Sequence, residues 1–349
     1  PTWNPGANGP VFTLATDMSY VYAGGSFTSA GGRSYSRLTR IDRNTGLTPI
    51  GFSPTPNGAI STILVSGDYL YVGGTFTTIG GQTRGRAAKI WRTTASLGQA
   101  TAWNPDANSE VTALASDGTS LFVGGNFTTI AGATRERLAK FSLADGSLVA
   151  GWDPVANATV RTIAINKDST EGSVNRVLVG GDFTEIDSVS TGCAAVLGYT
   201  TGTLTGPLTF GSPSNTVRTI VVGEDDYIYM GGVFTSVYSQ IDRRRLVRFN
   251  NDASLSPDGA WNPVPLGTDV KCVAISTTAS STKMGVGGDM FSVGAHRRNR
   301  IAALDATGKP KSWYPTGGAT DPVRTIEYTG NGKLYIGGDF TTVGGSTRN

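Results

Sequence analysis

Gly124-Gly125-Asn126-Phe127-Thr128 is the stretch of sequence that decides the predicted fold. The phrase Gly-Gly-x-Phe-Thr returns along the whole chain, with Met290 in place of Phe in one copy. The copies lie 49 to 56 residues apart, counted between their second glycines, which are Gly25, Gly74, Gly125, Gly181, Gly232, Gly288 and Gly338. A period of this length indicates an array of repeated structural units.

Each unit carries four strand-like pieces around this phrase. The first follows a polar turn, as in residues 160–165, and the second runs into the glycine pair. The third follows a recurrent arginine, as in residues 137–141. The fourth ends in an aromatic residue and a proline, and we expect its aromatic ring to pack between the outer edges of neighbouring units; these rings are Trp3, Phe52, Trp103, Trp152, Phe210, Trp261 and Trp313.

Four short strands in each unit, separated by Gly, Asp and Asn turns, are typical of a propeller blade. Continuous apolar runs such as Leu121-Phe122-Val123 indicate strands buried on both faces. We therefore predict an all-β fold, a single seven-bladed β-propeller over residues 1–349 with four-stranded antiparallel blades. The N-terminal segment is expected to close the ring by pairing in the last blade, and the glycine pairs to let backbones pass close together.

The extended repeat, Gly-Gly-x-Phe-Thr-x-Val/Ile-Gly-Gly-x-x-Arg-x-Arg-Leu-Ala, then Trp/Phe-Asn-Pro and Val-Arg-Thr-Ile, resembles the bacterial delta-sixty repeat family of β-propellers. The resemblance covers the whole chain, with departures at Cys193, Met290, Phe52 and Phe210. Such repeats occur in secreted, cell-surface and phage-tail proteins. The resemblance thus implies an extracellular structural or binding role, and it supplies no catalytic residues.

Charge and cysteine content exclude several classes of partner. The 29 Lys and Arg against 26 Asp and Glu give a net charge of +3, too small to predict a nucleic-acid partner. No apolar run is long enough to span a bilayer, so membrane insertion is not expected. Cys193 and Cys272 with one histidine do not make a zinc site of the usual kind, and we predict no metal and no cofactor.

The last unit lacks its third strand. Arg348 and Asn349 stand where the next Arg-Leu-Ala strand would begin, while residues 1–5 supply a fourth strand ahead of the first unit. Unpaired strand edges are templates for another strand, so we expect an assembly slot formed by Trp3, Gly337, Gly338, Arg348 and Asn349. The polypeptide continuing past Asn349, another domain of the same protein, or a neighbouring subunit could fill it, and subunit donation would generate a filament.

A second candidate site lies at the predicted mouth of the central channel. The second residue of the first strand is a cation in four consecutive units, namely Arg161, Arg218, Lys271 and Arg324. These side chains could form an anion-binding rim for an acidic sugar or for a partner's carboxylates. The alternative is a solvated channel mouth without a ligand. The arginines that precede the third strands are instead expected to pair with carbonyls or carboxylates of a neighbouring blade.

Catalytic residues are not predicted. His296 is the only histidine and stands in a basic loop without a nucleophile, and the acid pairs Glu185 with Asp187 and Asp225 with Asp226 are candidates by proximity only. We therefore expect a non-enzymatic protein, located outside the cell, at the cell surface or on a virion. Its role is predicted to be a subunit or module of a surface assembly or filament that self-associates or binds another domain. The alternatives are a glycan-binding adhesin or phage-tail receptor-binding module and a propeller-type hydrolase.

Overall fold

The computed structural model describes residues 3–93, 96–166, 175–205, 213–237, 241–252, 254–278, 281–329 and 332–348. All the regular secondary structure assigned in these ranges consists of β-strands. Within the same ranges, no helix is long and apolar enough to cross a membrane. Asn349 and Phe210, which were named from the sequence, lie outside the described residues.

Each repeat folds into a small antiparallel sheet. The first strands are β1 (Val11–Thr16), β4 (Ile60–Ser66), β9 (Val111–Ser116), β14 (Val160–Asn166), β19 (Val217–Val222), β24 (Pro265–Thr278) and β28 (Val323–Tyr328). The second strands carry the glycine pair and are β2 (Tyr20–Gly25), β5 (Tyr69–Gly74), β10 (Ser120–Gly125), β15 (Arg176–Gly181), β20 (Tyr227–Gly232), β25 (Ser281–Val293) and β29 (Leu334–Gly338).

The third strands follow the recurrent arginine or Cys193, as predicted. They are β3 (Leu38–Asp42), β8 (Ala87–Trp91), β13 (Leu138–Ser142), β18 (Ala194–Gly198), β23 (Leu246–Asn250) and β27 (Ile301–Leu304). In each of these sheets the second strand is central and pairs with both others. The last sheet, β28 with β29, has two strands within the described ranges.

The fourth pieces correct the prediction of four-stranded blades. They form isolated bridges to the third strands, such as Phe141 with Leu148 and Leu304 with Pro310, in place of continuous fourth strands. The physical reason is local. A tight turn brings the chain back for about one residue pair, and the proline that follows the aromatic residue has no N–H to donate to a ladder.

Short hairpins after the glycine pairs were not predicted. They are β6 (Thr78–Ile79) with β7 (Gln82–Thr83), β11 (Thr129–Ile130) with β12 (Ala133–Thr134), β16 (Glu185–Ile186) with β17 (Val189–Ser190), β21 (Ser236–Val237) with β22 (Ile241–Asp242), the end of β25 with β26 (His296–Arg297), and β30 (Thr342–Val343) with β31 (Ser346–Thr347). Gly80 and Gly81 form one of their turns with φ of +59° and +77°, values that favour glycine.

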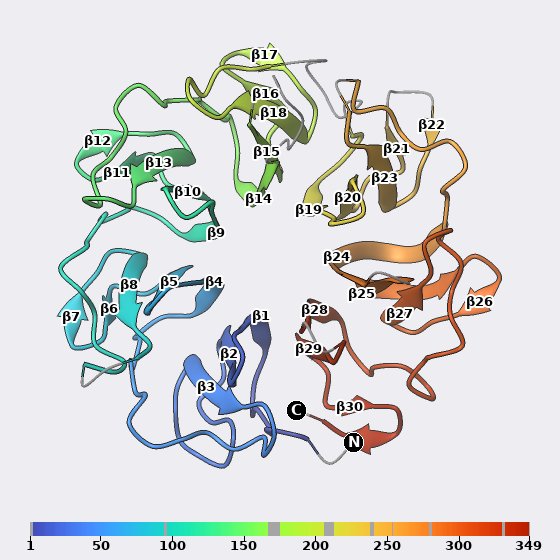
Figure 1. The fold of residues 1–349 in the computed structure, drawn as a ribbon, viewed down its shortest axis with the longest axis horizontal. Coiled ribbons are helices and arrows are strands. Elements are labelled where there is room, and N and C mark those ends of the chain that lie inside the picture. Colours follow the sequence, from blue (N-terminus) through green and yellow to red (C-terminus); the bar gives the residue numbers. More distant parts are fainter. Residues whose placement is uncertain are drawn as a thin grey trace.

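The sheets are arranged around a central axis in a propeller-like fold, with the first strands nearest the centre (Figure 1). The first and last sheets lie side by side, because β1 contacts β28 and β29. Hydrogen bonds join them: Leu14 N–H donates to Thr325 Oγ1 at 3.2 Å, and Thr16 Oγ1 donates to Glu327 Oε1 at 3.2 Å.

The glycine pairs set the spacing between sheets. A Cβ on Gly73 would lie 2.5 Å from Cγ1 of Val111 in the next sheet, and a Cβ on Gly74 would lie 2.0 Å from the Ala59 carbonyl oxygen of its own sheet. Gly337 of the last sheet makes the same contact with Val11 of the first, at 2.6 Å. The glycines are therefore required for close approach, as expected from the sequence.

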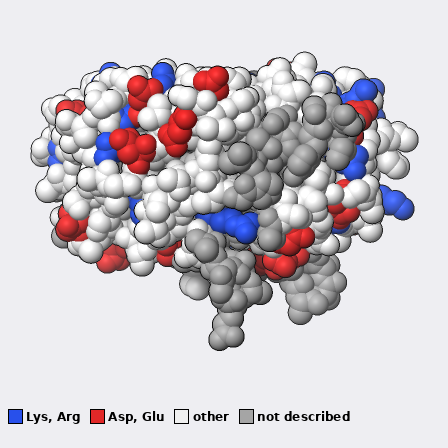
Figure 2. All heavy atoms as spheres, turned by 90° about the horizontal axis from the view of Figure 1, so that it is seen from above, with Lys and Arg blue, Asp and Glu red and all other residues white. Residues whose placement is uncertain are grey.

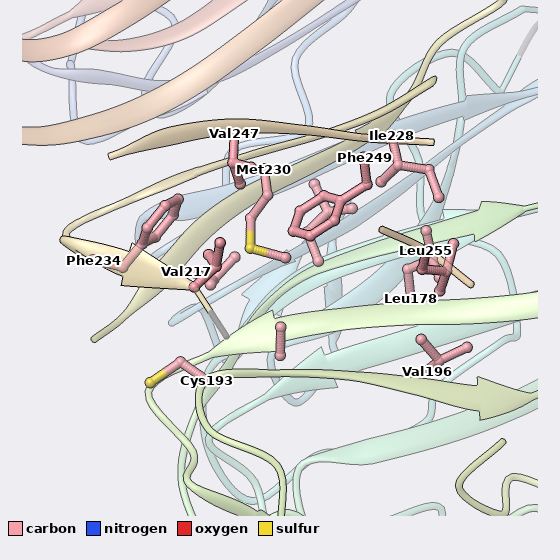
Figure 3. Close-up of a cluster of buried hydrophobic side chains, with 13 residues drawn as sticks. Leu178, Cys193, Val196, Val217, Ile228, Met230, Phe234, Val247, Phe249 and Leu255 are labelled. Carbon is pink, nitrogen blue, oxygen red and sulfur yellow. The ribbon is translucent and has the colours of Figure 1, made fainter. Parts of the chain in front are cut away.

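Hydrophobic clusters fill the space between neighbouring sheets. One of them, between the sheets of β15 and β20, includes Leu178, Val217, Met230 and Phe249, each at most 4% exposed (Figure 3). Cys193 lies at its edge as a free thiol. Since both faces of each central strand are covered, the strands read as continuous apolar runs.

Aromatic rings of the fourth pieces lie between sheets, as predicted for Trp103. Its ring meets Tyr71 of the preceding sheet and Phe141 of the following one, with centroids 5.5 Å apart in both cases. Trp3 occupies the matching place between the last sheet and the first, where it packs on Tyr335 at 4.8 Å and donates to the Asp42 carbonyl at 3.0 Å. The N-terminal segment was expected to pair as a strand in the last blade, but residues 3–10 form no strand. In the described chain, side-chain contacts such as that of Trp3 with Tyr335 connect this segment to the last sheet.

Candidate functional site

The cations at the predicted channel rim each have a carboxylate partner. Arg161 donates from Nε to Asp182 Oδ1 at 2.8 Å and from Nη2 to Oδ2 at 2.5 Å, a two-point pair. Thr216 Oγ1 also donates to Asp182. Burial raises the pKa of Asp182, but the hydrogen bonds and the charge of Arg161 outweigh it and hold that pKa below its usual value.

Asp269 holds two of the rim cations together. Its Oδ2 accepts from Arg218 Nε at 3.1 Å and from Lys271 Nζ at 2.8 Å, and its side chain is only 6% exposed. Arg218 comes from β19 and Asp269 from β24, so this carboxylate links two neighbouring sheets. A buried carboxylate with two cations is a structural joint whose removal would leave both cations unpaired.

Arg324 completes the rim beside the first sheet. Its Nε donates to Asp339 Oδ1 at 2.7 Å, and its guanidinium carbon lies 5.2 Å from the centroid of the Phe12 ring. These pairings were not predicted from the sequence, although Asp182 and Asp339 follow the glycine pairs of units whose first strands carry Arg161 and Arg324. An acidic ligand would have to displace these carboxylates, and anion binding at the rim stays a prediction.

Acidic and basic side chains are interspersed on the face drawn in Figure 2, and most of that surface is uncharged. Among the described residues, no group of three or more His, Cys, Asp or Glu side chains is placed to hold a metal ion. His296 is exposed in β26. Of the acid pairs, Asp187 accepts from Val155 N–H and Asp225 from the Tyr229 hydroxyl, so both serve local structure.

The outer edge of β29 is the second candidate site. In the other sheets a third strand covers the second strand, and the residues that match Leu334 and Ile336, such as Leu70 and Val72, are fully buried. Leu334 and Ile336 are only half-buried. The last sheet therefore presents an apolar strand edge, which is the usual template for addition of another strand.

Backbone groups along this edge match ones that are bonded elsewhere. Gly25 N–H donates to the Arg37 carbonyl at 2.9 Å, and Gly125 N–H donates to the Arg137 carbonyl at 3.1 Å. No residue in the described ranges provides the corresponding acceptor to Gly338. Because Gly338 is buried, bulk water does not replace the missing carbonyl as a hydrogen-bond acceptor for its N–H.

The residues predicted for the assembly slot lie around this edge in different roles. Gly337 packs on Val11, Gly338 offers its amide, and Trp3 closes one side through Tyr335. Asn4 Nδ2 donates to the Thr347 carbonyl at 3.1 Å, which brings the N-terminal segment beside β31. Arg348 follows β31, and its N–H donates to the Thr341 carbonyl at 2.8 Å, as Arg84 N–H does to Thr77.

Trp313 departs from the other tryptophans of the fourth pieces. Its side chain is 48% exposed, whereas Trp152 and Trp261 are buried. The indoles of Trp103 and Trp152 each donate to a glycine carbonyl in or just after the third strand of the following sheet, Gly146 and Gly198. The sheet that follows Trp313 is the last one, and Gly285 stands where Tyr71 supports Trp103. The expectation that Trp313 packs between sheets is therefore corrected.

Comparison with known proteins supports the propeller fold. Residues 116–158 and 329–349 match a family described as a domain of unknown function (DUF5122) β-propeller. No curated protein matches the chain.

Solved structures agree on the fold alone. The WD40 β-propeller domain of Doa1 matches with a TM-score of 0.63 at 14% identity, over 96% of this chain and 92% of that one. The Pan2 WD40 domain of Neurospora crassa matches with a TM-score of 0.58 at 11% identity, over 95% and 86%. The computationally designed Ika8 protein matches with a TM-score of 0.56 at 13% identity, over 97% of both chains. The chain thus has an all-β propeller-like fold that resembles WD40 propellers.

Proposed function

We propose that this protein is a non-enzymatic extracellular interaction module, a part of a surface assembly or filament. In this proposal residues 1–349 form one seven-bladed propeller of the delta-sixty type, and another segment or chain completes the last blade. The edge of β29, with Leu334 and Ile336 only partly buried where the other sheets have fully buried residues, is the observation that carries it.

The contacts between the first and last sheets support a closed ring. Gly337 on Val11 repeats the contact of Gly73 on Val111, and Trp3 on Tyr335 repeats that of Trp103 on Tyr71. The contact between the first glycine of a pair and the next sheet recurs at every boundary, and the β29 edge is the place where the repeat is incomplete. An exposed strand edge that persists in a stable protein is normally protected or used for pairing.

Location and assembly state test the proposal. Intact cells or particles that produce the protein are labelled with gold-conjugated antibody before and after permeabilisation, and label on the intact surface is expected. Label seen only after permeabilisation would exclude an extracellular role. Light scattering of the purified chain over a concentration series then separates a self-assembling subunit, whose mass grows with concentration, from a module that stays monomeric and is attached to a larger protein.

Glycan binding is the second candidate function, and the exposed Trp313 favours it. Exposed indoles provide apolar faces for sugar rings, and Arg298 lies over the adjacent Tyr314 ring at 4.8 Å. Titration with a glycan panel should quench or shift the fluorescence of the chain but not of a Trp313→Phe variant. Binding of acidic glycans alone, lost in a triple variant with Arg161, Arg218 and Arg324 changed to Gln, would instead locate the site at the rim.

A further inference from the structure

We infer that the edge of β29 binds an extended segment with the pattern Arg-Leu-x-x-Phe/Ile/Leu followed by a glycine turn, and that this turn covers Trp313. The inference rests on the part of the proposed function in which another segment completes the last sheet. It adds the chemical class of that segment and the register in which it binds.

The third strands of the other sheets define the pairing. In each case the strand runs antiparallel to the second strand, with Gly73 opposite Ala87 and Gly124 opposite Leu138. Side chains one and four positions after the arginine are buried, as are Leu138 and Phe141 after Arg137. A segment in the same register would bury Leu334 and Ile336 and would accept the hydrogen bond of Gly338 N–H.

The Ala7 carbonyl is placed to accept a hydrogen bond from the arginine at the start of the segment. The third-strand arginines have φ near +65°, and they donate to a neighbouring sheet: Arg137 Nη1 to the Ala156 carbonyl at 2.8 Å and Arg37 Nη1 to the Pro56 carbonyl at 3.1 Å. Ala7 precedes Val11 by the same spacing as Ala156 precedes Val160. Ala7 is 4% exposed, and no donor to its carbonyl is found in the described part of the chain.

The turn after the strand has its own partner in Trp313. Gly146 lies nine positions after Arg137, its carbonyl accepts from the Trp103 indole at 3.1 Å, and a Cβ added to it would lie 2.8 Å from Cδ1 of that ring. Gly46, nine positions after Arg37, also lies against a tryptophan, since a Cβ added to it would be 3.4 Å from Cδ1 of Trp3, although the Trp3 indole donates to the Asp42 carbonyl instead. Trp313 is the matching indole for the last sheet. Its exposure and the open edge of β29 therefore have one cause, the same uncovered strand and turn.

The occupant is not one of the third strands already present in the chain. Leu38, Leu138 and Leu246 are fully buried in their own sheets, so a second copy could donate such a strand only by unfolding a sheet. The segment is therefore a stretch of polypeptide outside residues 1–349 that carries the pattern.

A peptide with the sequence of residues 135–149 tests the inference, since it carries the pattern, the glycine turn and no tryptophan. Added to the purified chain, it should bind with one-to-one stoichiometry in calorimetry, shift the tryptophan emission to shorter wavelength and protect it from acrylamide. Trp313→Phe should retain peptide binding and lose most of the fluorescence change. A peptide with Leu138→Asp and Phe141→Asp should bind at least about tenfold more weakly, because both side chains enter buried positions.

Three outcomes would overturn the inference. They are no binding of the peptide at about millimolar concentration, equal binding of the Asp-substituted peptide, and a fluorescence change that survives in Trp313→Phe. Joining the same segment covalently after residue 348 guards against weak affinity, because the tether supplies a high effective concentration. A fused chain whose melting temperature does not rise would also count against it. Surface labelling is independent of these measurements, so the inference and the extracellular role can fail separately.

Discussion

The indole ring of Trp3 stands edge-on against the ring of Tyr335, with 4.8 Å between the ring centroids and 66° between the planes. This contact joins the N-terminal segment to the last sheet, and the Trp3 indole N–H bonds to Asp42 of the first sheet. The same kind of contact is found inside the chain between Tyr229 and Trp261 at 5.6 Å. The boundary between first and last sheets is thus built like the internal ones.

Trp3→Ala should lower the free energy of unfolding by about 2–3 kcal/mol, because it removes a half-buried indole that contacts both sheets. Trp313→Ala is the matched control and should change stability by less than about 0.5 kcal/mol, since that side chain is exposed. Urea denaturation followed by circular dichroism gives both values. Equal losses for the two variants would mean that Trp3 does not hold the sheets together in solution.

Gly337→Ala should destabilise the protein by about 1–3 kcal/mol, because the new Cβ would meet Val11 of the first sheet. Gly180→Ala, which meets Val217 in the same way at an internal boundary, should cost a similar amount. Gly151→Ala, with nothing near its added Cβ, serves as the neutral control. Val11→Ala should recover part of the loss in a double variant. A Gly337→Ala change that costs far less than Gly180→Ala would show that the first and last sheets separate.

Glu327 makes stability depend on pH. Burial between β28 and β1 raises its pKa from 4.5 to about 7, only partly offset by the hydrogen bond from Thr16. The unfolded chain loses this proton more readily than the folded one, so the free energy of unfolding should fall as pH rises from 4.5 to 7 and level off above that. The fall is at most about 3 kcal/mol.

Glu327→Gln isolates this contribution from those of other carboxylates. Denaturation curves at several pH values should show that the difference between wild type and variant grows from low to neutral pH, with the variant the more stable at pH 8. A difference that does not change with pH would mean that Glu327 titrates as an exposed carboxylate.

Asp269→Ala should cost about 2–4 kcal/mol, because it leaves Arg218 and Lys271 without their carboxylate in a partly buried place. Asp242→Ala removes the exposed pair with Arg244 and should stay within about 0.5 kcal/mol. Thermal denaturation at low and high salt compares the two. If Asp269→Ala lowers the stability no more than Asp242→Ala does, the ion pairs of Asp269 with Arg218 and Lys271 do not stabilise the fold.

The repeat pattern was sufficient to predict the first three strands of the sheets and the role of the glycine pairs. Gly73 shows why: a residue without a side chain, repeated at the exit of each central strand, has few explanations other than close approach. The two-residue hairpins were missed because a short Thr-Ile stretch before Gly80 has no alternation long enough to indicate a strand.

The candidate site was predictable only where it follows the repeat. The absence of a third-strand pattern in the last unit was visible in the sequence, whereas the ion pair of Arg218 with Asp269 joins different repeats and depends on how the sheets pack. Trp313 was expected to be covered because its motif matches Trp103. Trp313 is exposed because the last sheet has no third strand in the described chain and the preceding sheet has Gly285 in place of a supporting Tyr. The motif around Trp313 contains no information about either neighbour.

Gly337 of the last sheet packs on Val11 of the first sheet. The two sheets are therefore neighbours around the axis, although they are the farthest apart along the described chain. Asn4 lies within hydrogen-bond distance of Thr347, so a short linker could bridge the two ends of the described chain. A circularly permuted version with its ends moved to another boundary would keep every packing contact. The arrangement of the sheets is thus determined by the packing contacts between them, such as that of Gly337 with Val11.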